Sequence, residues 1–307
     1  MISIVYLVVG FVLLVVGADR FVAGASSAAH KLGVPSLIIG LTIVAFGTSA
    51  PELAVSVTAA LKGANEIAVG NVLGSNIFNL LGVAGVSAIV CPLVASRELT
   101  RRDWPLSIAA AALLGIFLLT GSTLARWEGA ILLVFFAALL AAQLRPALQN
   151  RQVETTEDQV MRTSKIILQI VFGLAAIVIG GDLSVDGATG LARMIGLSET
   201  VIGLTIVAIG TSLPELVTSL MAARRGENDI ALGNVIGSNL FNILFILGVS
   251  TVLNPIGVQF TSVLDTVFLI AISLIFLVPA WRGKLSRPVG ACMALCYVGY
   301  TAWLLVR

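Results

Sequence analysis

Two glutamates, Glu52 and Glu215, stand inside apolar stretches of the sequence and are its most chemically distinctive residues. A carboxylate at the centre of a bilayer costs about 3 kcal/mol on insertion scales, so each one requires a compensating partner. No Lys or Arg lies near either glutamate within its apolar stretch. The two carboxylates are therefore predicted to bind protons or metal cations.

Hydroxyl and amide side chains accompany both glutamates at helical spacing. One helix face carries Thr48, Ser49, Glu52 and Ser56, and its counterpart carries Thr211, Ser212, Glu215 and Ser219. The next apolar segments carry Asn71, Ser75 and Asn79 in one case and Asn234, Ser238 and Asn242 in the other. Such hard oxygens suit calcium and sodium better than zinc or copper. For Asn71 and Asn234, a structural bond between helices and a ligand role are equally open.

A proline precedes each glutamate, in the sequences GTSAPE (47–52) and GTSLPE (210–215). Proline within a span removes a backbone hydrogen bond and clashes with the carbonyl four residues earlier. Carbonyl oxygens near Gly47 and Thr48, and near Gly210 and Thr211, are therefore expected to be free to accept another partner.

The two glutamates belong to an internal repeat. Residues 40–83 match residues 203–246 without a gap, at an offset of 163, and 28 of the 44 positions are identical. Asp19 and Asp182 correspond at the same offset, and both are expected to form structural hydrogen bonds or to edge a pore. A match of this length records a duplication.

The composition places this duplication in a membrane. The 307 residues are 58% hydrophobic and 11% charged, and the mean hydropathy is +1.05. Ten apolar segments are long enough to span a bilayer. They cover residues 2–28, 34–61, 66–91, 104–121, 126–144, 164–190, 197–222, 229–253, 262–280 and 288–306. The prediction is an all-α integral membrane protein of ten transmembrane helices. A net charge of +2, with basic residues at segment ends, gives no indication of nucleic-acid binding.

The ten segments divide into two sets of five, which predicts a first repeat at 1–144, a cytoplasmic linker at 145–165 and a second repeat at 166–307. Because each repeat has an odd number of spans, the two enter the membrane from opposite sides, as in the inverted repeats of secondary transporters. Thirteen Lys and Arg residues fall in the loops on the linker side and four on the other side. The positive-inside rule then predicts that both termini face outside.

The doubled motif, G-T-S-x-P-E followed by G-N-x-x-G-S-N-x-F-N, resembles the two alpha repeats of the calcium:cation antiporter superfamily, in particular the compact prokaryotic sodium/calcium exchangers. This resemblance implies four ion sites in a diamond at the centre of a ten-helix fold. Calcium would be bound by Glu52, Glu215 and the backbone oxygens of Thr48 and Thr211. Sodium sites would draw on Ala45, Ser49, Ser75, Ala208, Ser212 and Ser238, with Asn79 and Asn242 completing the diamond.

Sodium/calcium exchange by alternating access, electrogenic and located in the cell membrane, is the leading functional prediction. A calcium/proton antiporter on the same fold is an alternative, because two unpaired carboxylates can also carry protons. A potassium-dependent exchanger on the same fold is another alternative. In the potassium-dependent exchangers that the chain resembles, an Asp at the position of Asn242 is associated with potassium use, so the Asn found here counts against potassium coupling. A passive channel is disfavoured, since no selectivity-filter sequence is present.

Other classes of function find no support in the sequence. No arrangement of His, Cys or Ser offers a nucleophile with its base, so an enzyme is not expected. His30 and the three cysteines lack the spacing of a zinc or haem site. No cofactor is expected; the predicted partners are calcium, sodium and the lipid bilayer, with no obligate protein partner.

Overall fold

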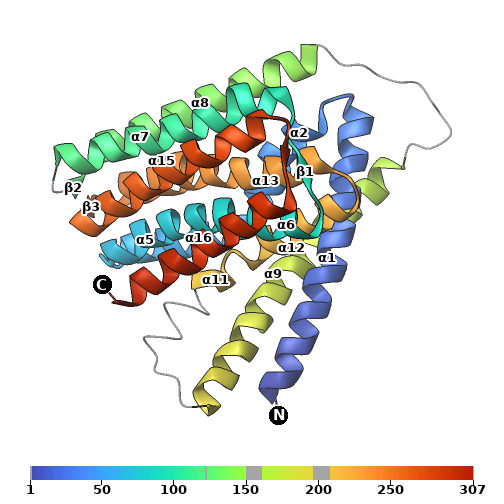
Figure 1. Cartoon of the computed structure of the whole chain (residues 1–307), viewed down its shortest axis with the longest axis horizontal. Coiled ribbons are helices and arrows are strands. Elements are labelled where there is room, and N and C mark those ends of the chain that lie inside the picture. Colours follow the sequence, from blue (N-terminus) through green and yellow to red (C-terminus); the bar gives the residue numbers. More distant parts are fainter. Residues whose placement is uncertain (1, 122, 150–160, 196–207, 307) are drawn as a thin grey trace.

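The chain is almost entirely helical in a computed structural model that describes residues 2–121, 123–149, 161–195 and 208–306 (Figure 1). Here η denotes a π-helical turn. The first half contains α1 (Ile2–Leu32), α2 (Ser36–Ile39), η1 (Gly40–Val44), α3 (Ala45–Thr48), α4 (Ala50–Leu61), α5 (Asn65–Phe78), η2 (Asn79–Val83), α6 (Ala84–Val90), β1 (Leu93–Val94), η3 (Leu99–Asp103), α7 (Trp104–Thr120), β2 (Thr123–Leu124) and α8 (Arg126–Gln149). The second half contains α9 (Thr163–Met194), α11 (Ala208–Gly210), α12 (Leu213–Arg224), α13 (Asn228–Leu240), η5 (Phe241–Ile246), α14 (Leu247–Leu253), β3 (Ile256–Gly257), α15 (Phe260–Trp281), β4 (Lys284–Leu285) and α16 (Arg287–Val306).

Seven helices in the described part of the chain are long and apolar enough to cross a membrane. They are Ile2–Leu32, Ile67–Val90, Leu99–Thr120, Arg126–Arg145, Thr163–Met194, Asn228–Leu253 and Phe260–Trp281. A bent pair, Ser36–Thr48 with Ala50–Leu61, passes the same test together. The expected segment 197–222 begins outside the described residues, and α16, over the tenth expected segment, is not one of the seven. The prediction of a multi-pass helical membrane protein is confirmed; the count of ten remains a prediction.

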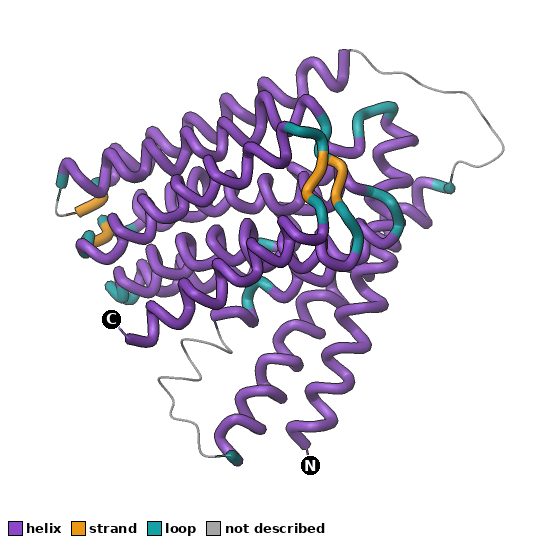
Figure 2. Tube along the Cα trace, viewed as in Figure 1, coloured by secondary structure: helices purple, strands orange, loops and turns teal. Residues whose placement is uncertain are grey.

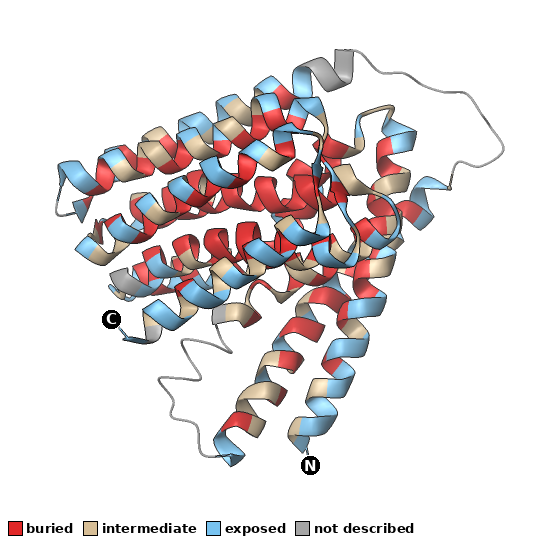
Figure 3. Ribbon diagram, viewed as in Figure 1, coloured by how far each residue is buried: buried red, intermediate tan, exposed pale blue. Residues whose placement is uncertain are grey.

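Two long helical segments occupy the centre of the molecule. Ile67–Val90 and Asn228–Leu253 are mostly buried inside the protein, whereas the outer helices, such as α1 and α8, expose much of their apolar surface (Figure 3). Apolar side chains on an outer surface are stable in lipid, because hydrocarbon tails solvate them as well as a protein core does. The central position of α5 and α13 matters because these helices carry the second set of candidate site residues.

Helices α1 and α9 lie side by side and run antiparallel (Figures 1 and 2). Their contact is lined by glycines at seven-residue spacing: Gly10, Gly17 and Gly24 on α1, and Gly173, Gly180 and Gly187 on α9. A Cβ atom added at Gly17 would lie 2.9 Å from the carbonyl oxygen of Gly173. Small residues of this kind let two backbones approach closely, which is how transmembrane helices gain packing energy in the absence of a hydrophobic driving force. We call this contact the glycine seam.

Two short antiparallel strand pairs join the halves at the helix ends. Strand β1 pairs with β4, with Leu93 opposite Leu285, and β2 pairs with β3, with Thr123 opposite Gly257. Each pair therefore takes one strand from either half of the chain. The backbone groups of these loops form hydrogen bonds that would otherwise require water.

Candidate ion-binding site

The candidate site is built on two broken helices. Helix α3 ends at Thr48, Ser49 takes a non-helical conformation, and α4 starts at Ala50 with Pro51 in its first turn. The axes of the two segments differ by 51°. Proline is well tolerated in the first turn of a helix, because the N–H that it lacks would have no intrahelical partner there. The helix therefore breaks before the proline. Glu52 follows within this first turn, where the partial positive charge of a helix N-terminus stabilises a carboxylate.

The same arrangement recurs in the second half. Helix α11 ends at Gly210, α12 begins at Leu213 with Pro214 in its first turn, and Glu215 follows. Ser212 has nearly the same backbone conformation as Ser49, with φ of −97° against −85°. The predicted interruption of both spans is therefore present.

The glutamates are fully buried and contact serines across the two halves of the chain. Ser49 donates a hydrogen bond from Oγ to Oε1 of Glu215 at 2.8 Å, and Ser212 donates one to Oε1 of Glu52 at 2.9 Å. Each broken helix therefore supplies a hydroxyl to the carboxylate of the other. The two glutamates, 163 residues apart in sequence, belong to one site.

The central helices add further hydroxyls to both carboxylates. Ser75 on α5 lies 3.4 Å from Oε1 of Glu52 and 3.2 Å from the Ser212 hydroxyl. Ser238 on α13 lies 3.5 Å from Oε1 of Glu215. Both distances are at the long end for O–H···O bonds, so these hydroxyls are held only loosely to the carboxylates.

Several oxygens in this site have no hydrogen-bond partner although they are buried. They include Oε2 of both glutamates, Oδ1 of Asn79 and Asn242, and Oγ1 of Thr211. Within the part of the chain that the structure describes, neither glutamate forms an ion pair; Arg102 pairs with Asp103, and Arg225 pairs with Asp19. Buried carboxylates without a compensating charge are very costly, and a bound cation would supply both that charge and a partner for the unpartnered oxygens.

Two π-helical turns position the asparagines. Turn η2 begins at Asn79, directly after α5, and η5 begins at Phe241 and includes Asn242. Single π-helical turns inside α-helices are frequent at functional sites. Both asparagine side chains are fully buried.

Other residues of the predicted oxygen ladders hold the helices together. Nδ2 of Asn71 donates to Oγ of Ser56 at 2.8 Å and to the backbone oxygen of Glu52 at 3.2 Å. In the other half, Asn234 makes the corresponding bonds to Ser219 and Glu215 at 2.9 and 3.3 Å. Of the two open roles for Asn71 and Asn234, the structural one is therefore observed.

The remaining predicted ligands are Thr48, Ala45 and Ala208. The Thr48 hydroxyl lies 3.0 Å from Oδ1 of Asn234 and 3.1 Å from the backbone oxygen of Val44. The buried Ala45 has a carbonyl that accepts the backbone N–H of Ser49 at 3.0 Å. Ala208 is the first residue of α11, and its side chain lies outside the described set. Among the described residues, no three His, Cys, Asp or Glu side chains lie together so that they could hold a metal ion. Carboxylates alone therefore do not make up the site.

A second pair of asparagines, Asn76 and Asn239, was not singled out by the sequence reasoning. Nδ2 of Asn76 donates to the backbone oxygen of Asn239 at 3.1 Å, and Nδ2 of Asn239 donates to that of Asn76 at 3.2 Å. Asn242 also donates to Oδ1 of Asn76 at 2.9 Å. These crossed bonds join α5 to α13 beside the site. Their signal was the first asparagine of the repeated G-S-N-x-F-N motif.

A cavity of about 570 Å³ lies next to the broken helices. It is lined by the start of α4, the Gly210–Thr211 turn and one side of α9, including the exposed Asp182 and Asp186. Asp19, the counterpart of Asp182, forms an ion pair with Arg225 instead. Of the two roles expected for these aspartates, Asp19 takes the bonding one and Asp182 lies at the edge of a cavity.

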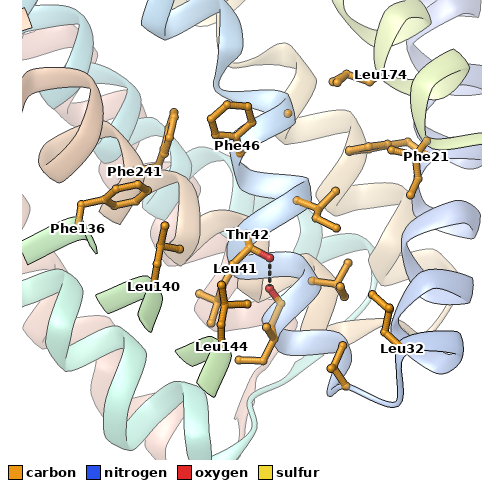
Figure 4. Close-up of a pocket in the computed structure, with 16 residues that line it drawn as sticks. Phe21, Leu32, Leu41, Thr42, Phe46, Phe136, Leu140, Leu144, Leu174 and Phe241 are labelled. Carbon is orange, nitrogen blue, oxygen red and sulfur yellow. Dashed lines mark hydrogen bonds between the residues drawn. The ribbon is translucent and has the colours of Figure 1, made fainter. Parts of the chain in front are cut away.

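Another cavity, of about 540 Å³, is almost wholly apolar and has no oxygen set suited to a cation (Figure 4). Phe46, Phe136 and Phe241 line one part of it, and Phe21 and Leu174 line another. Thr42 is its one polar side chain, and the Thr42 hydroxyl already donates to the backbone oxygen of Ile38. This cavity therefore offers no candidate cation site.

Fold and site together define a multi-pass helical membrane protein with a buried, oxygen-rich polar centre. The family model described as sodium/calcium exchanger protein matches residues 2–145 and 165–306, and the chain belongs to this family. The chain is 41% identical to the putative antiporter CaxA of Alkalimonas amylolytica, over 98% of each protein. It is 36% identical to the sodium/calcium exchanger MaX1 of Methanosarcina acetivorans, over 97% of each. A solved structure of the sodium-calcium exchanger NCX_Mj superposes with a TM-score of 0.88 at 30% identity, covering 98% of both chains.

Proposed function

We propose that this chain is a secondary active antiporter that exchanges sodium for calcium across the cell membrane by alternating access. The observation that carries the proposal is the pair of fully buried glutamates, each with one oxygen unpartnered and each bonded to a serine of the opposite half. Calcium prefers six to eight oxygen ligands, including carboxylates and carbonyls, and the site offers carboxylate, amide, hydroxyl and backbone oxygens.

The calcium ligands in this proposal are Glu52, Glu215 and the backbone oxygens of Thr48 and Thr211. Sodium would use the hydroxyls of Ser49, Ser75, Ser212 and Ser238, the backbone of Ala45 and Ala208, and the amide oxygens of Asn79 and Asn242. Two of these groups, Asn79 Oδ1 and Asn242 Oδ1, are buried without a hydrogen-bond partner, and so is the side-chain Oγ1 of Thr211.

Electrostatics prevents calcium and a full set of sodium ions from occupying the site at the same time. Two ionised glutamates contribute a charge of −2 to a low-dielectric site, so a single calcium ion neutralises them. Adding calcium to a site already filled by sodium would leave excess positive charge where desolvation is very costly. Competition of this kind, combined with gates that close only over a filled site, produces exchange. If more than two sodium ions replace each calcium, the cycle is electrogenic.

The architecture in this proposal is ten transmembrane helices in two inverted five-helix repeats, 1–144 and 166–307, joined by a cytoplasmic linker at 145–165, with both termini outside. What supports it is the recurrence of the same side-chain contacts at the offset of 163 residues. The bonds of Ser49, Asn71 and Asn76 each have a counterpart made by Ser212, Asn234 and Asn239.

The proposal is tested by uptake of radioactive calcium into proteoliposomes, with sodium, potassium and proton gradients imposed in turn. We expect uptake to follow an outward sodium gradient and to be unaffected by a pH gradient when sodium is absent. Calcium flux that follows a pH gradient without sodium would instead support the proton antiporter. Uptake that requires internal potassium together with sodium would support a potassium-dependent exchanger.

A further inference from the structure

The two halves of the protein differ in how their first helices contact the broken helices. Helix α1 packs directly against α12. The counterpart contact, between α9 and α4, is interrupted by the cavity of about 570 Å³, which Ala54 lines from α4 and Asp182 from α9. Val217, the counterpart of Ala54 on α12, is only 8% exposed. One face of the site is therefore covered by helix packing, and the other is open to a cavity.

An ion pair holds the covered face together. Nε and Nη2 of Arg225, in the turn after α12, both donate to Oδ1 of Asp19 on α1, at 3.0 and 2.5 Å. Two turns further along α1, the Ser26 hydroxyl donates to Glu227. The side chains of Arg225 and Asp19 are 39% and 35% exposed, so the pair lies at the edge of the contact.

The counterparts of this ion pair have the same charges but are not paired. At the offset of 163, Arg225 corresponds to Lys62 and Asp19 to Asp182. Lys62 follows α4 and is exposed, and Asp182 is exposed on the cavity wall. Gly63 and Gly226, which follow Lys62 and Arg225, have φ values of 72° and 79°, so both basic residues precede the same type of turn.

We propose that Asp19–Arg225 and Asp182–Lys62 are alternative ion pairs, each formed when its own face of the site is closed. These four are positioning residues: they fix α1 against α12 or α9 against α4 and touch no transported ion. The proposal rests on the alternating access of the proposed function. The glycine seam ties α1 to α9, so movement of α9 onto α4 carries α1 away from α12.

The two faces do not have the same number of polar links. Glu227, which accepts the bond from Ser26, corresponds to Ala64 in the first half. The closed face seen here therefore has a second polar link that the other face lacks. This difference biases the resting protein toward the conformation with the cavity open on the Asp182 side.

Cysteine labelling measures the two conformations separately. In a variant whose three native cysteines are replaced by serine, Ala54→Cys reports the open α9–α4 face, and Val217→Cys reports opening of the α1–α12 face. Reaction rates with a polar maleimide are measured on purified protein. Partly exposed ion pairs are worth up to about 1 kcal/mol, which corresponds to a change of up to about fivefold in a two-state equilibrium.

We expect Arg225→Gln, and independently Asp19→Asn, to accelerate labelling of Val217→Cys about two- to fivefold and to slow that of Ala54→Cys. Lys62→Gln should slow labelling of Val217→Cys by a similar factor. Arg225→Lys, or the exchange Asp19→Arg with Arg225→Asp, should restore the original rates. A pair with a merely structural role would not give opposite effects for Arg225→Gln and Lys62→Gln.

The proposal is overturned if the two glutamine variants change Val217→Cys labelling in the same direction, or if neither changes it in monodisperse protein. Because labelling requires no ion gradient, its outcome is independent of the transport assay. A chain that failed to exchange sodium for calcium could still show the opposite effects, and an active exchanger could lack them.

Discussion

At the scale of single residues, the site depends on two carboxylates that no protein cation neutralises. Glu52 and Glu215 are equivalent in burial, in their place within a first helical turn, and in the serine that bonds each of them. The bonded serines come from the opposite half, so neither broken helix contains a complete site.

Replacing either carboxylate tests this shared site. We expect Glu52→Gln and Glu215→Gln each to reduce sodium-driven calcium uptake to background, because one remaining negative charge cannot neutralise a divalent ion in a low-dielectric site. The exposed Glu98 provides the matched control, and Glu98→Gln should transport normally. Uptake near the wild-type rate by either buried variant, in correctly inserted protein, would contradict the shared-site proposal.

The crossed asparagines beside the site lead to a stability prediction. Asn76→Ala and Asn239→Ala each remove an amide that bonds a backbone oxygen of the facing helix. Interhelical bonds in membranes contribute about 0.6–2 kcal/mol, so the thermal midpoint in detergent should fall by a few degrees. Asn228→Ala is the control, because its amide makes only a long bond within an exposed turn. Equal midpoints for all three variants would show that the crossed bonds do not stabilise the helix pair.

At the scale of elements, the glycine seam brings α1 and α9 together. Gly17→Ala places a Cβ atom 2.9 Å from the carbonyl oxygen of Gly173, and backbone at that distance can relieve the clash only if the helices separate. We expect a loss of about 1–3 kcal/mol, as for overpacked cores, measured as a lower thermal midpoint. Gly299→Ala on α16 is the control: no atom lies within 4 Å of the added Cβ, so it should be neutral or slightly stabilising. The seam would be refuted if both variants behaved alike.

At the scale of the whole molecule, the uneven distribution of basic residues predicts orientation. In the cysteine-free variant, Thr123→Cys should react with an impermeant maleimide from outside intact cells, and Ser164→Cys should react only after lysis. Both positions are exposed in the structure, so access depends on the side of the membrane. Labelling of Ser164→Cys in intact cells would invert the proposed topology.

The proposed electrogenic cycle predicts a response to voltage. If more than two sodium ions leave as one calcium enters, each cycle moves net positive charge out of a vesicle. An inside-positive potential, set with a potassium ionophore, should therefore accelerate sodium-driven calcium uptake. Uptake that is independent of the imposed potential, at a fixed sodium gradient, would indicate electroneutral exchange.

The sequence by itself determined the membrane class, the repeat and the two glutamates. These inferences depend on local quantities: the length of an apolar segment, the identity of residues at a fixed offset, and the lack of a basic residue near a carboxylate. The helix breaks before Glu52 and Glu215 were also predictable, because a proline inside a helix removes a backbone hydrogen bond and kinks or breaks the helix. The role of Asp19 and Asp182 could be narrowed only to bonding or a pore edge.

Only the tertiary structure decided which atoms meet. Each glutamate bonds a serine from the other half, and Asn76 and Asn239 exchange bonds across α5 and α13, although the residues of each pair are about 160 positions apart. The ion pair between Asp19 and Arg225, without a matching pair at Asp182 and Lys62, was equally invisible in the sequence. A repeat predicts equivalent partners in both halves, but one conformation need not form both members of a pair of equivalent contacts, and which of them forms depends on how whole helices pack.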